Sequence, residues 1–254
     1  DVAPSRGLGD VYKRQTLKYQ LHDFKTSLLV FLSIYLTVAI VIGAFFIWTG
    51  SKPESANLNG SNSMDFSSTI FTFIMGLAIF KEHFWMVTQN GISRKTFFKS
   101  CMYCMLIINF ILAIATVVFT LFFTQMSGLD WSTMFGVLYS KFDQNIIITF
   151  IVHTFFIFSA YNLSFLSGYF VTILFYKASK IGKVIIAAGL PVLFFFILPL
   201  SYGFIPKFWN AVFNFLFHIT GMESGNPLYG IITISVIAVV LGIGSYPLAK
   251  RVEI

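Results

Sequence analysis

The chain has 254 residues, of which 57% are hydrophobic and only 11% are charged, and its mean hydropathy is +0.81. A soluble globular domain has about a quarter of its residues charged, so this composition excludes an ordinary soluble domain and predicts a membrane protein. The formal net charge of +7 does not indicate a nucleic-acid partner, because most basic residues flank apolar stretches, where they can also meet anionic lipid.

The first fifteen residues differ from the rest. Positions 7–15 read Gly-Leu-Gly-Asp-Val-Tyr-Lys-Arg-Gln, which resembles a translated sequencing adapter. We therefore interpret residues 1–15 as a non-native segment, exclude them from the fold, and expect their removal to leave membrane insertion unchanged. Residues 16–254 are predicted to form one membrane domain, because no link between the apolar stretches is long enough for a second domain.

An amphipathic stretch follows at Thr16–Thr26. Its apolar residues recur at helical spacing on one face, and its basic residues fall on the opposite face; the apolar positions are Leu17, Leu21, Phe24 and Leu28, and the basic ones are Lys18, His22 and Lys25. This pattern predicts a helix lying in the cytoplasmic interface of the membrane. A plain extension of the first membrane-spanning helix is the alternative.

Six long apolar stretches come next. Each has about 20 residues or more, which at 1.5 Å per residue covers the roughly 30 Å hydrocarbon core of a bilayer. They are Ser27–Thr49, Phe66–Met86, Cys101–Thr124, Asn145–Tyr176, Val184–Phe204 and Leu228–Ala249. The sequence therefore predicts an all-α polytopic membrane protein with six transmembrane helices.

Basic residues alternate along the links between these stretches. The second and fourth links and both ends are rich in them, whereas the first, third and fifth links mix Lys with Asp or Glu; the basic groups are Lys18 and Lys25, then Arg94, Lys95 and Lys99, then Lys177, Lys180 and Lys183, then Lys250 and Arg251. Lys and Arg are retained on the cytoplasmic side of a membrane. Both ends of the chain are therefore predicted to lie inside the cell.

The link after the second stretch has the signals of a sharp helix break. Asn90-Gly91 is suited to end a helix, and Ser93 is placed to cap a new one. Ile92 and Phe97 have the spacing of a hydrophobic staple across that cap. These residues predict a short basic helix on the cytoplasmic face, leading into the third span.

Three short runs here resemble the permease subunits of type-2 ABC exporters: Phe80-Lys81-Glu82, Asn90-Gly91-Ile92-Ser93-Arg94 and Phe97-Phe98-Lys99. The layout of residues 16–254 is similar too, although the family often has Pro where Ile92 stands. The resemblance implies that the short helix couples to a separate ATPase. The coupling residues it implies are Glu82, Asn90, Gly91, Ser93, Arg94, Lys95, Phe97, Phe98 and Lys99.

The resemblance also implies the partners. They are a cytoplasmic ABC ATPase, which holds the ATP and Mg, and either a second copy of this chain or a second permease subunit. No cofactor is expected on this chain, which has no phosphate-binding Gly-x-x-x-x-Gly-Lys-Ser/Thr motif and is not expected to be an enzyme. The expected location is the cytoplasmic membrane of a bacterium.

The third and fifth links also have helical patterns. Trp131, Phe135, Leu138 and Phe142 share one face, as do Phe208, Val212, Phe215 and Ile219. Pro206 suits the first turn of the second of these helices and Gly221 its end. At about 14 residues that segment is too short to cross and return as two spans, so it is either re-entrant, as the resemblance implies, or an amphipathic surface helix outside the cell.

Few polar groups lie within the spans. The possible polar residues of a translocation path are Asn109, His153 and Asn162, and His153 is either a proton site or a hydrogen-bonded packing residue. Cys101 and Cys104 have Cys-x-x-Cys spacing but no second pair, so packing is favoured over a metal or redox role. Pro191 and Pro199 predict an irregular fifth span.

These observations predict a permease subunit that exports an amphipathic or hydrophobic substrate, such as a peptide, lipid or drug, with energy from a separate ATPase. The alternative is a stand-alone membrane protein, either a secondary transporter using His153 or an immunity or sensor protein.

Overall fold

The computed structural model describes residues 6–49, 63–89, 93–127, 133–142 and 144–250, and this part of the chain is helical without a strand. The helices are α1 (Arg6–Thr49), α2 (Ser63–Gln89), α3 (Arg94–Ser127), α4 (Met134–Leu138), α5 (Ile146–Lys177), α6 (Lys180–Val192), the π-helical turn η2 (Leu193–Ile197), α7 (Leu198–Phe204), α8 (Pro206–Ile219) and α9 (Pro227–Lys250). The prediction of an all-α fold is confirmed.

Five stretches of the described helices are long and apolar enough to cross a membrane: Leu17–Val38, Arg94–Phe122, Ile146–Lys177, Lys180–Phe204 and Pro227–Ala249. The chain is therefore a multi-pass membrane protein by the length and composition of its helices. The predicted second span falls on α2, whose apolar part Met64–Ile79 is shorter than the other five.

The first helix is one unbroken element. α1 continues from Arg6 through to Thr49, so the separate interfacial helix predicted at Thr16–Thr26 is wrong, and the alternative, an extension of the first span, is what the structure has. The physical reason is that no Pro or Gly occurs between Thr16 and Ile42 to end the helix. Residues 6–15 of the adapter-like segment are helical as the start of α1.

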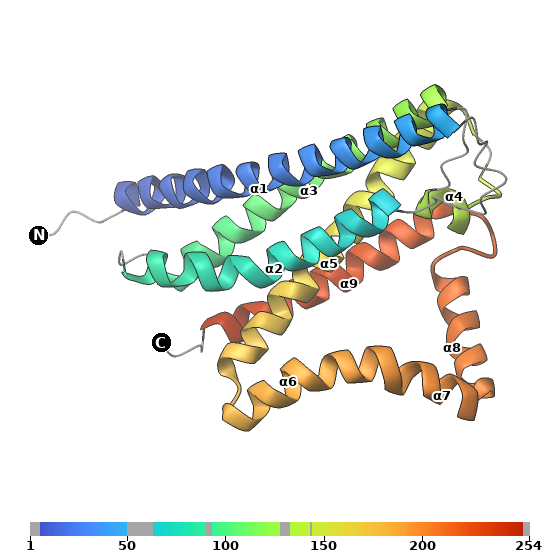
Figure 1. Ribbon diagram of the computed structural model, residues 1–254. Helices are drawn as coiled ribbons and strands as arrows, with labels where there is room; N and C mark the ends of the chain where they lie inside the picture. Colours follow the sequence, from blue (N-terminus) through green and yellow to red (C-terminus); the bar gives the residue numbers. More distant parts are fainter. Residues whose placement is uncertain (1–5, 50–62, 90–92, 128–132, 143, 251–254) are drawn as a thin grey trace, which may run out of the picture.

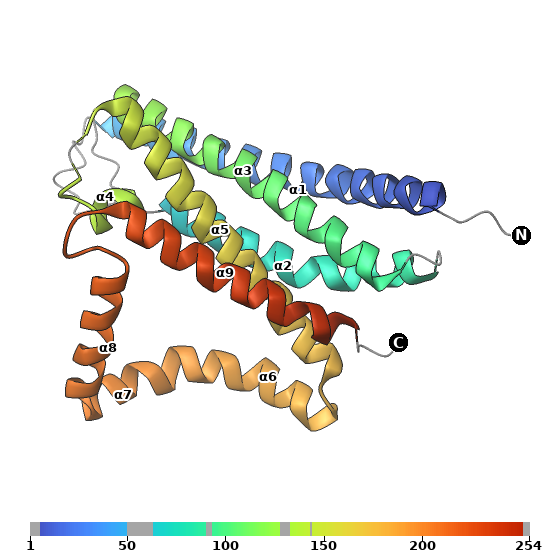
Figure 2. The same cartoon turned by 180° about the vertical axis from the view of Figure 1, so that it is seen from behind.

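Helix α5 is the centre of the bundle. It packs most extensively against α2 and α9 and also contacts α3, while α1 lies along α3. Figure 2 shows α3 and α9 on either side of α5. The core that these helices share contains large buried rings, including Phe156, Tyr161, Phe165 and Tyr169 on α5.

Two glycines let α2 and α5 approach closely. A Cβ atom added at Gly76 of α2 would lie 2.1 Å from the carbonyl oxygen of Phe165, and one added at Gly168 of α5 would lie 2.2 Å from the carbonyl oxygen of Phe73. No side chain fits at these distances, so the two backbones are in direct contact. Small residues at helix crossings are the usual means of close packing in membranes.

Hydroxyl groups on both sides of Gly168 add to this contact. Ser164 Oγ donates a hydrogen bond of 2.7 Å to the carbonyl oxygen of Thr69, and Thr172 Oγ1 donates one of 3.2 Å to that of Leu77. Ser164, Gly168 and Thr172 are four residues apart, so they form one stripe of small residues along α5. This stripe fixes the register of α5 against α2.

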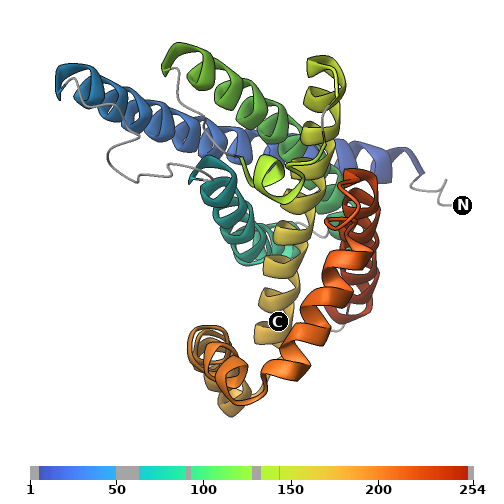
Figure 3. The same ribbon diagram turned by 90° about the vertical axis from the view of Figure 1, so that its right-hand side faces the viewer.

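The predicted fifth span is irregular, as expected from its prolines. It consists of α6, η2 and α7, with Pro191 inside α6 and Pro199 in the first turn of α7. Pro199 has no N–H to donate to the helical turn before it, and a widened π-helical turn adjoins it there. No residue of the membrane-spanning part of Lys180–Phe204 is buried within the described chain. Figures 1 and 3 show α6 and α7 apart from the bundle.

The basic links gather at one end of the bundle. The starts of α1 and α3, the turn from α5 to α6 and the end of α9 all lie at the left in Figure 1, whereas α4, α8 and the start of α9 lie at the right. We call these the basic end and the opposite end. α8 crosses between α7 and α9 at a steep angle to both (Figure 1), begins with Pro206 as predicted, and is followed by Gly221 at φ +70°.

The charge alternation predicts that the basic end is cytoplasmic. Lys180 and Lys141 are both exposed and belong to the basic end and the opposite end respectively. In a variant whose Cys101 and Cys104 are replaced by alanine, we expect an impermeant thiol reagent to label Lys141→Cys but not Lys180→Cys in intact cells. Both cysteines should react after lysis. Labelling of Lys180→Cys alone in intact cells would reverse the orientation.

Candidate functional site

The predicted cap at the start of α3 is confirmed. Ser93 precedes the helix, and its Oγ accepts a hydrogen bond of 3.2 Å from the backbone N–H of Thr96, while its carbonyl accepts from the N–H of Phe97 at 3.0 Å. The helix that it starts runs without a break to Ser127. The expected short coupling helix is therefore not a separate element but the first turns of α3, because no residue there interrupts the helix.

The coupling residues fall into two groups by burial. Ser93, Lys95 and Lys99 are exposed and Arg94 is half-buried, so these side chains can face a partner. Phe97 is only 2% exposed and belongs to the core.

Three of the remaining predicted coupling residues have side chains or positions that lie outside the described part of the chain. The backbone of Glu82 lies in α2, but its side chain is outside the described residues, as are Asn90, Gly91 and the staple residue Ile92. The side chain of Phe98 is described, and it packs against α9 and α5 rather than standing with the exposed residues Ser93, Lys95 and Lys99. Its ring centroid lies 5.2 Å from that of Tyr246 on α9 and 6.1 Å from that of Tyr169 on α5.

A cavity of about 570 Å³ lies between α3, α5 and α9, and we call it the α3–α5–α9 cavity. Its lining is mainly apolar, with Phe98, Met102 and Met105 from α3 among the residues nearest the basic end. Its polar lining residues are Asn162, Ser159 and Ser235, together with Tyr246, whose ring carries a hydroxyl. Its volume falls within the about 300–1,000 Å³ that is usual for small-molecule sites.

Two of the three predicted path residues meet at this cavity. Asn109 on α3, which is 1% exposed, donates its Nδ2 hydrogen to Asn162 Oδ1 on α5 over 2.9 Å. Beside them, the hydroxyls of Ser159 and Ser235 are 3.1 Å apart. These contacts join α3, α5 and α9 through polar side chains within an apolar interior, where each such group needs a partner.

The third predicted residue, His153, lies elsewhere. It is nine residues before Asn162 on α5, which is about 13 Å along a helix. Its ring stacks on that of Phe135, with centroids 5.0 Å apart, and its Nε2 has no partner among the described residues. It lines a separate cavity of about 300 Å³ with Thr149, Tyr139 and Ser140. The structure does not join His153 to the asparagine pair.

A buried carboxyl group, Asp65, was not among the predicted site residues. It lies in the first turn of α2, just before the predicted second span, and is 2% exposed. Its Oδ2 accepts a hydrogen bond of 2.8 Å from the N–H of Met134, the first residue of α4. The sequence signal for this residue was an acidic side chain directly before an apolar run. That signal does not reveal its partner Met134 in α4, because the two residues are 69 positions apart.

Burial raises the pKa of Asp65 from its ordinary value of 3.8 to about 6, against the opposing hydrogen bond from Met134. The folded state thus holds this proton more tightly than the unfolded state, so stability is greatest below pH 4 and falls as the pH rises towards 6. Between pH 5 and pH 8 we expect this carboxyl to remove about 1 kcal/mol of stability. Thermal melting of the purified protein at these two pH values should show this loss of stability. The Asp65→Asn variant, which has no carboxyl group to ionise at this position, should lack this part of the loss.

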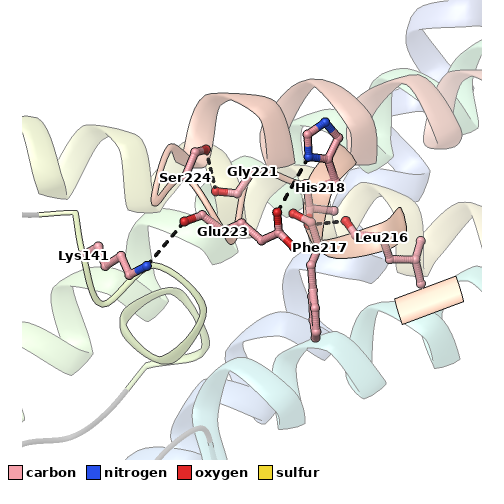
Figure 4. A network of polar contacts seen from close by, with 8 residues as sticks. Lys141, Leu216, Phe217, His218, Gly221, Glu223 and Ser224 are labelled. Atoms are coloured by element: carbon pink, nitrogen blue, oxygen red, sulfur yellow. Dashed lines mark hydrogen bonds and ion pairs between the residues drawn. The ribbon is translucent and has the colours of Figure 1, made fainter. Parts of the chain in front are cut away.

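The opposite end is held by a polar turn between α8 and α9. Figure 4 shows Lys141 Nζ donating to the carbonyl oxygen of Glu223 at 3.4 Å, and His218 Nδ1 lying 3.7 Å from the Glu223 carboxylate. Burial raises the pKa of Tyr139 to about 12, so its hydroxyl stays protonated and donates to the carbonyl oxygen of Thr220 at 2.8 Å. These contacts tie α4 to the α8–α9 turn.

The cysteine pair behaves as packing residues. Cys101 and Cys104 are both buried and unbonded to each other, and Gln20 Nε2 of α1 donates to Cys101 Sγ at 3.3 Å. Within the described ranges no group of three His, Cys, Asp or Glu side chains is placed to hold a metal ion. The pair therefore helps to seat α1 on α3.

Comparisons with protein-family models, curated proteins and solved structures found no match to this chain.

Proposed function

We propose that this chain is the membrane-spanning permease subunit of an ATP-binding cassette exporter, driven by a separate cytoplasmic ATPase. One observation carries the proposal: α3 contains both the capped basic segment Ser93–Lys99 and one wall of the α3–α5–α9 cavity. A force applied to the exposed Lys95 and Lys99 would therefore reach the cavity through a single continuous helix. The resemblance of Ser93–Lys99 to the coupling segment of type-2 exporters supports the same assignment.

Phe98 is the residue through which the coupling would act. It follows the basic turn directly, lines the cavity, and contacts Tyr246 of α9 edge to face. A tilt or rotation of the first turn of α3 would separate Phe98 from Tyr246 and change the width of the cavity at the basic end. ATP binding by the partner would supply that movement, and alternating access follows if the two arrangements open the cavity on different sides.

In this proposal the chain crosses the membrane six times and has both ends in the bacterial cytoplasm. α2 supplies the remaining crossing, since its 27 residues are enough for one span. α8 lies along the outer surface, because its steep angle to α7 and α9 (Figure 1) is that of a surface helix rather than of a re-entrant arm.

A second permease copy or subunit is part of the proposal. No residue of α6 and α7 that is described as spanning the membrane is buried within one chain, and Phe194, Phe195 and Phe196 between them are all exposed. They contact the rest of the chain mainly through the end of α5 and through α8. These helices are the face that a second copy or a paired permease would cover.

The proposal requires an ABC ATPase, whose gene is expected beside that of this chain, and the experiment is ATP-driven transport by the two proteins together. Cells expressing both proteins should export a fluorescent hydrophobic dye faster than cells expressing either protein alone. A substitution of the Walker lysine in the ATPase should return the rate to background. Equal export with the inactive ATPase would contradict the proposal.

Equal export with the inactive ATPase would favour the alternative of a stand-alone membrane protein, and one observation supports this alternative. His153 is buried beside a cavity, and its Nε2 has no hydrogen-bond partner in the described part of the chain. Buried ionisable groups in membranes mark proton pathways. Export that depends on the proton gradient and is lost in His153→Gln would then identify a secondary transporter.

A further inference from the structure

We infer that the α3–α5–α9 cavity binds an uncharged, single-chain amphiphile that enters sideways from the leaflet at the basic end. The inference rests on the proposed function, since it names the class of substrate that the permease would take. Its first support is chemical: among the described residues that line the cavity, none is Asp, Glu, Lys, Arg or His. A charged group placed there would lose its hydration without gaining a counter-ion.

The shape of the cavity suits one elongated chain. Its wall on α3 extends from Phe98 to Leu106, a rise of about 12 Å at 1.5 Å per residue. Flexible side chains, Met102 and Met105, line this length, and thioether side chains adapt to apolar ligands of varied shape. The Phe98–Tyr246 pair closes the end nearest the basic segment.

The polar residues of the cavity fix where the head of the ligand would lie. Asn162 is 8% exposed, and its one hydrogen bond in the described part of the chain uses Oδ1. Its Nδ2 amide therefore has hydrogens to donate. Ser235, whose described partner is Ser159, adds a hydroxyl. A carbonyl, ester or hydroxyl oxygen is the ligand group that these donors recognise.

The mouth of the cavity faces out of the bundle. Three lining residues are substantially exposed: Leu106 is 42%, Val239 is 58% and Ile243 is 69% exposed. In a membrane this surface meets acyl chains, so a ligand can enter from the bilayer without crossing water. Asn162 bonds Asn109, which lies further along α3 from the basic end than Phe98, and this places the head of the ligand towards the middle of the membrane.

The test uses a monoacylglycerol with a photoreactive diazirine in its acyl chain, bound to the full-length chain in nanodiscs. We expect peptides containing Met102 or Met105 to be labelled, with labelling reduced more than tenfold in Gly242→Phe. Gly242 lines the cavity, and a Cβ there would meet only the methyl groups of Leu166 at 3.8 Å. Gly244→Phe is the matched control, because nothing lies within 4 Å of a Cβ at Gly244.

A lysophosphatidic acid with the same acyl chain should label these peptides at least tenfold less. If Gly242→Phe does not fold, Val239→Trp at the exposed mouth should block labelling instead. Equal labelling by the two lipids, or unchanged labelling in the folded cavity variant, overturns the inference. No ATPase takes part, so labelling without ATP-driven export would overturn only the proposed function, and export without labelling would overturn only this site.

Discussion

Replacing Gly76 or Gly168 with alanine is expected to destabilise the protein strongly. The new Cβ would lie 2.1 or 2.2 Å from a backbone carbonyl oxygen of the facing helix, so α2 and α5 would have to separate. Overpacking of this kind costs about 1–3 kcal/mol and occasionally more, and backbone contacts cannot relax by a rotamer change. We expect a loss at the upper end of that range.

The measurement is the melting temperature of the purified protein in detergent. For a chain of this length, a loss of about 3 kcal/mol lowers it by roughly 6–12 °C. Gly244→Ala and Gly203→Ala are matched controls, since nothing lies within 4 Å of a Cβ at either position, and both should melt within a degree or two of the unmodified protein. If Gly76→Ala melts like these controls, the described contact between α2 and α5 is wrong.

Reversing the charge of Arg94 is expected to abolish association with the ATPase and with it transport. Arg94 is the first residue of α3, where a Glu side chain suits the helix dipole, so the substitution should not unfold the helix. A wrong-sign charge at a subunit contact is repulsive. We expect Arg94→Glu to reduce the co-purified ATPase at least tenfold while expression and membrane insertion are unchanged.

Lys180→Glu is the matched control. Lys180 is also the first residue of a helix capped by serine, since Ser179 Oγ accepts from the N–H of Gly182 at 3.3 Å, and it is also at the basic end. Ser93→Ala adds a second comparison, because loss of the cap costs only about 1 kcal/mol. Full association of both Arg94→Glu and Ser93→Ala would remove the coupling role from this segment.

The features that could be predicted from the sequence are those decided by neighbouring residues. Helices α3, α5 and α9 follow from long apolar runs, and the cap at Ser93 and the Pro206 start of α8 follow from local signals. The continuous helix α1 was only the alternative prediction, because an amphipathic pattern shows which face is polar, but not whether the chain bends between the surface and the span.

The rest depends on which helices are neighbours. The stripe of Ser164, Gly168 and Thr172 is visible in the sequence, but its partner Gly76 is known only once α2 and α5 are placed together. The Asn109–Asn162 hydrogen bond and the Asp65–Met134 contact likewise join residues that are 53 and 69 positions apart. The separation of His153 from Asn162 follows from their nine-residue spacing on one predicted span, whereas the choice of Asn109 as the partner of Asn162 could not be predicted.

A permease subunit must bind its ATPase, so the decisive measurement is co-purification of the unmodified chain with an ABC ATPase, whose gene is expected beside that of this chain. Both proteins would be expressed together, the membranes solubilised in mild detergent, and the permease purified through a tag on its C-terminus. If the chain is the permease of such an exporter, the ATPase elutes with it through size-exclusion chromatography and is lost in Arg94→Glu. Elution of the well-folded chain without any ATPase would contradict it.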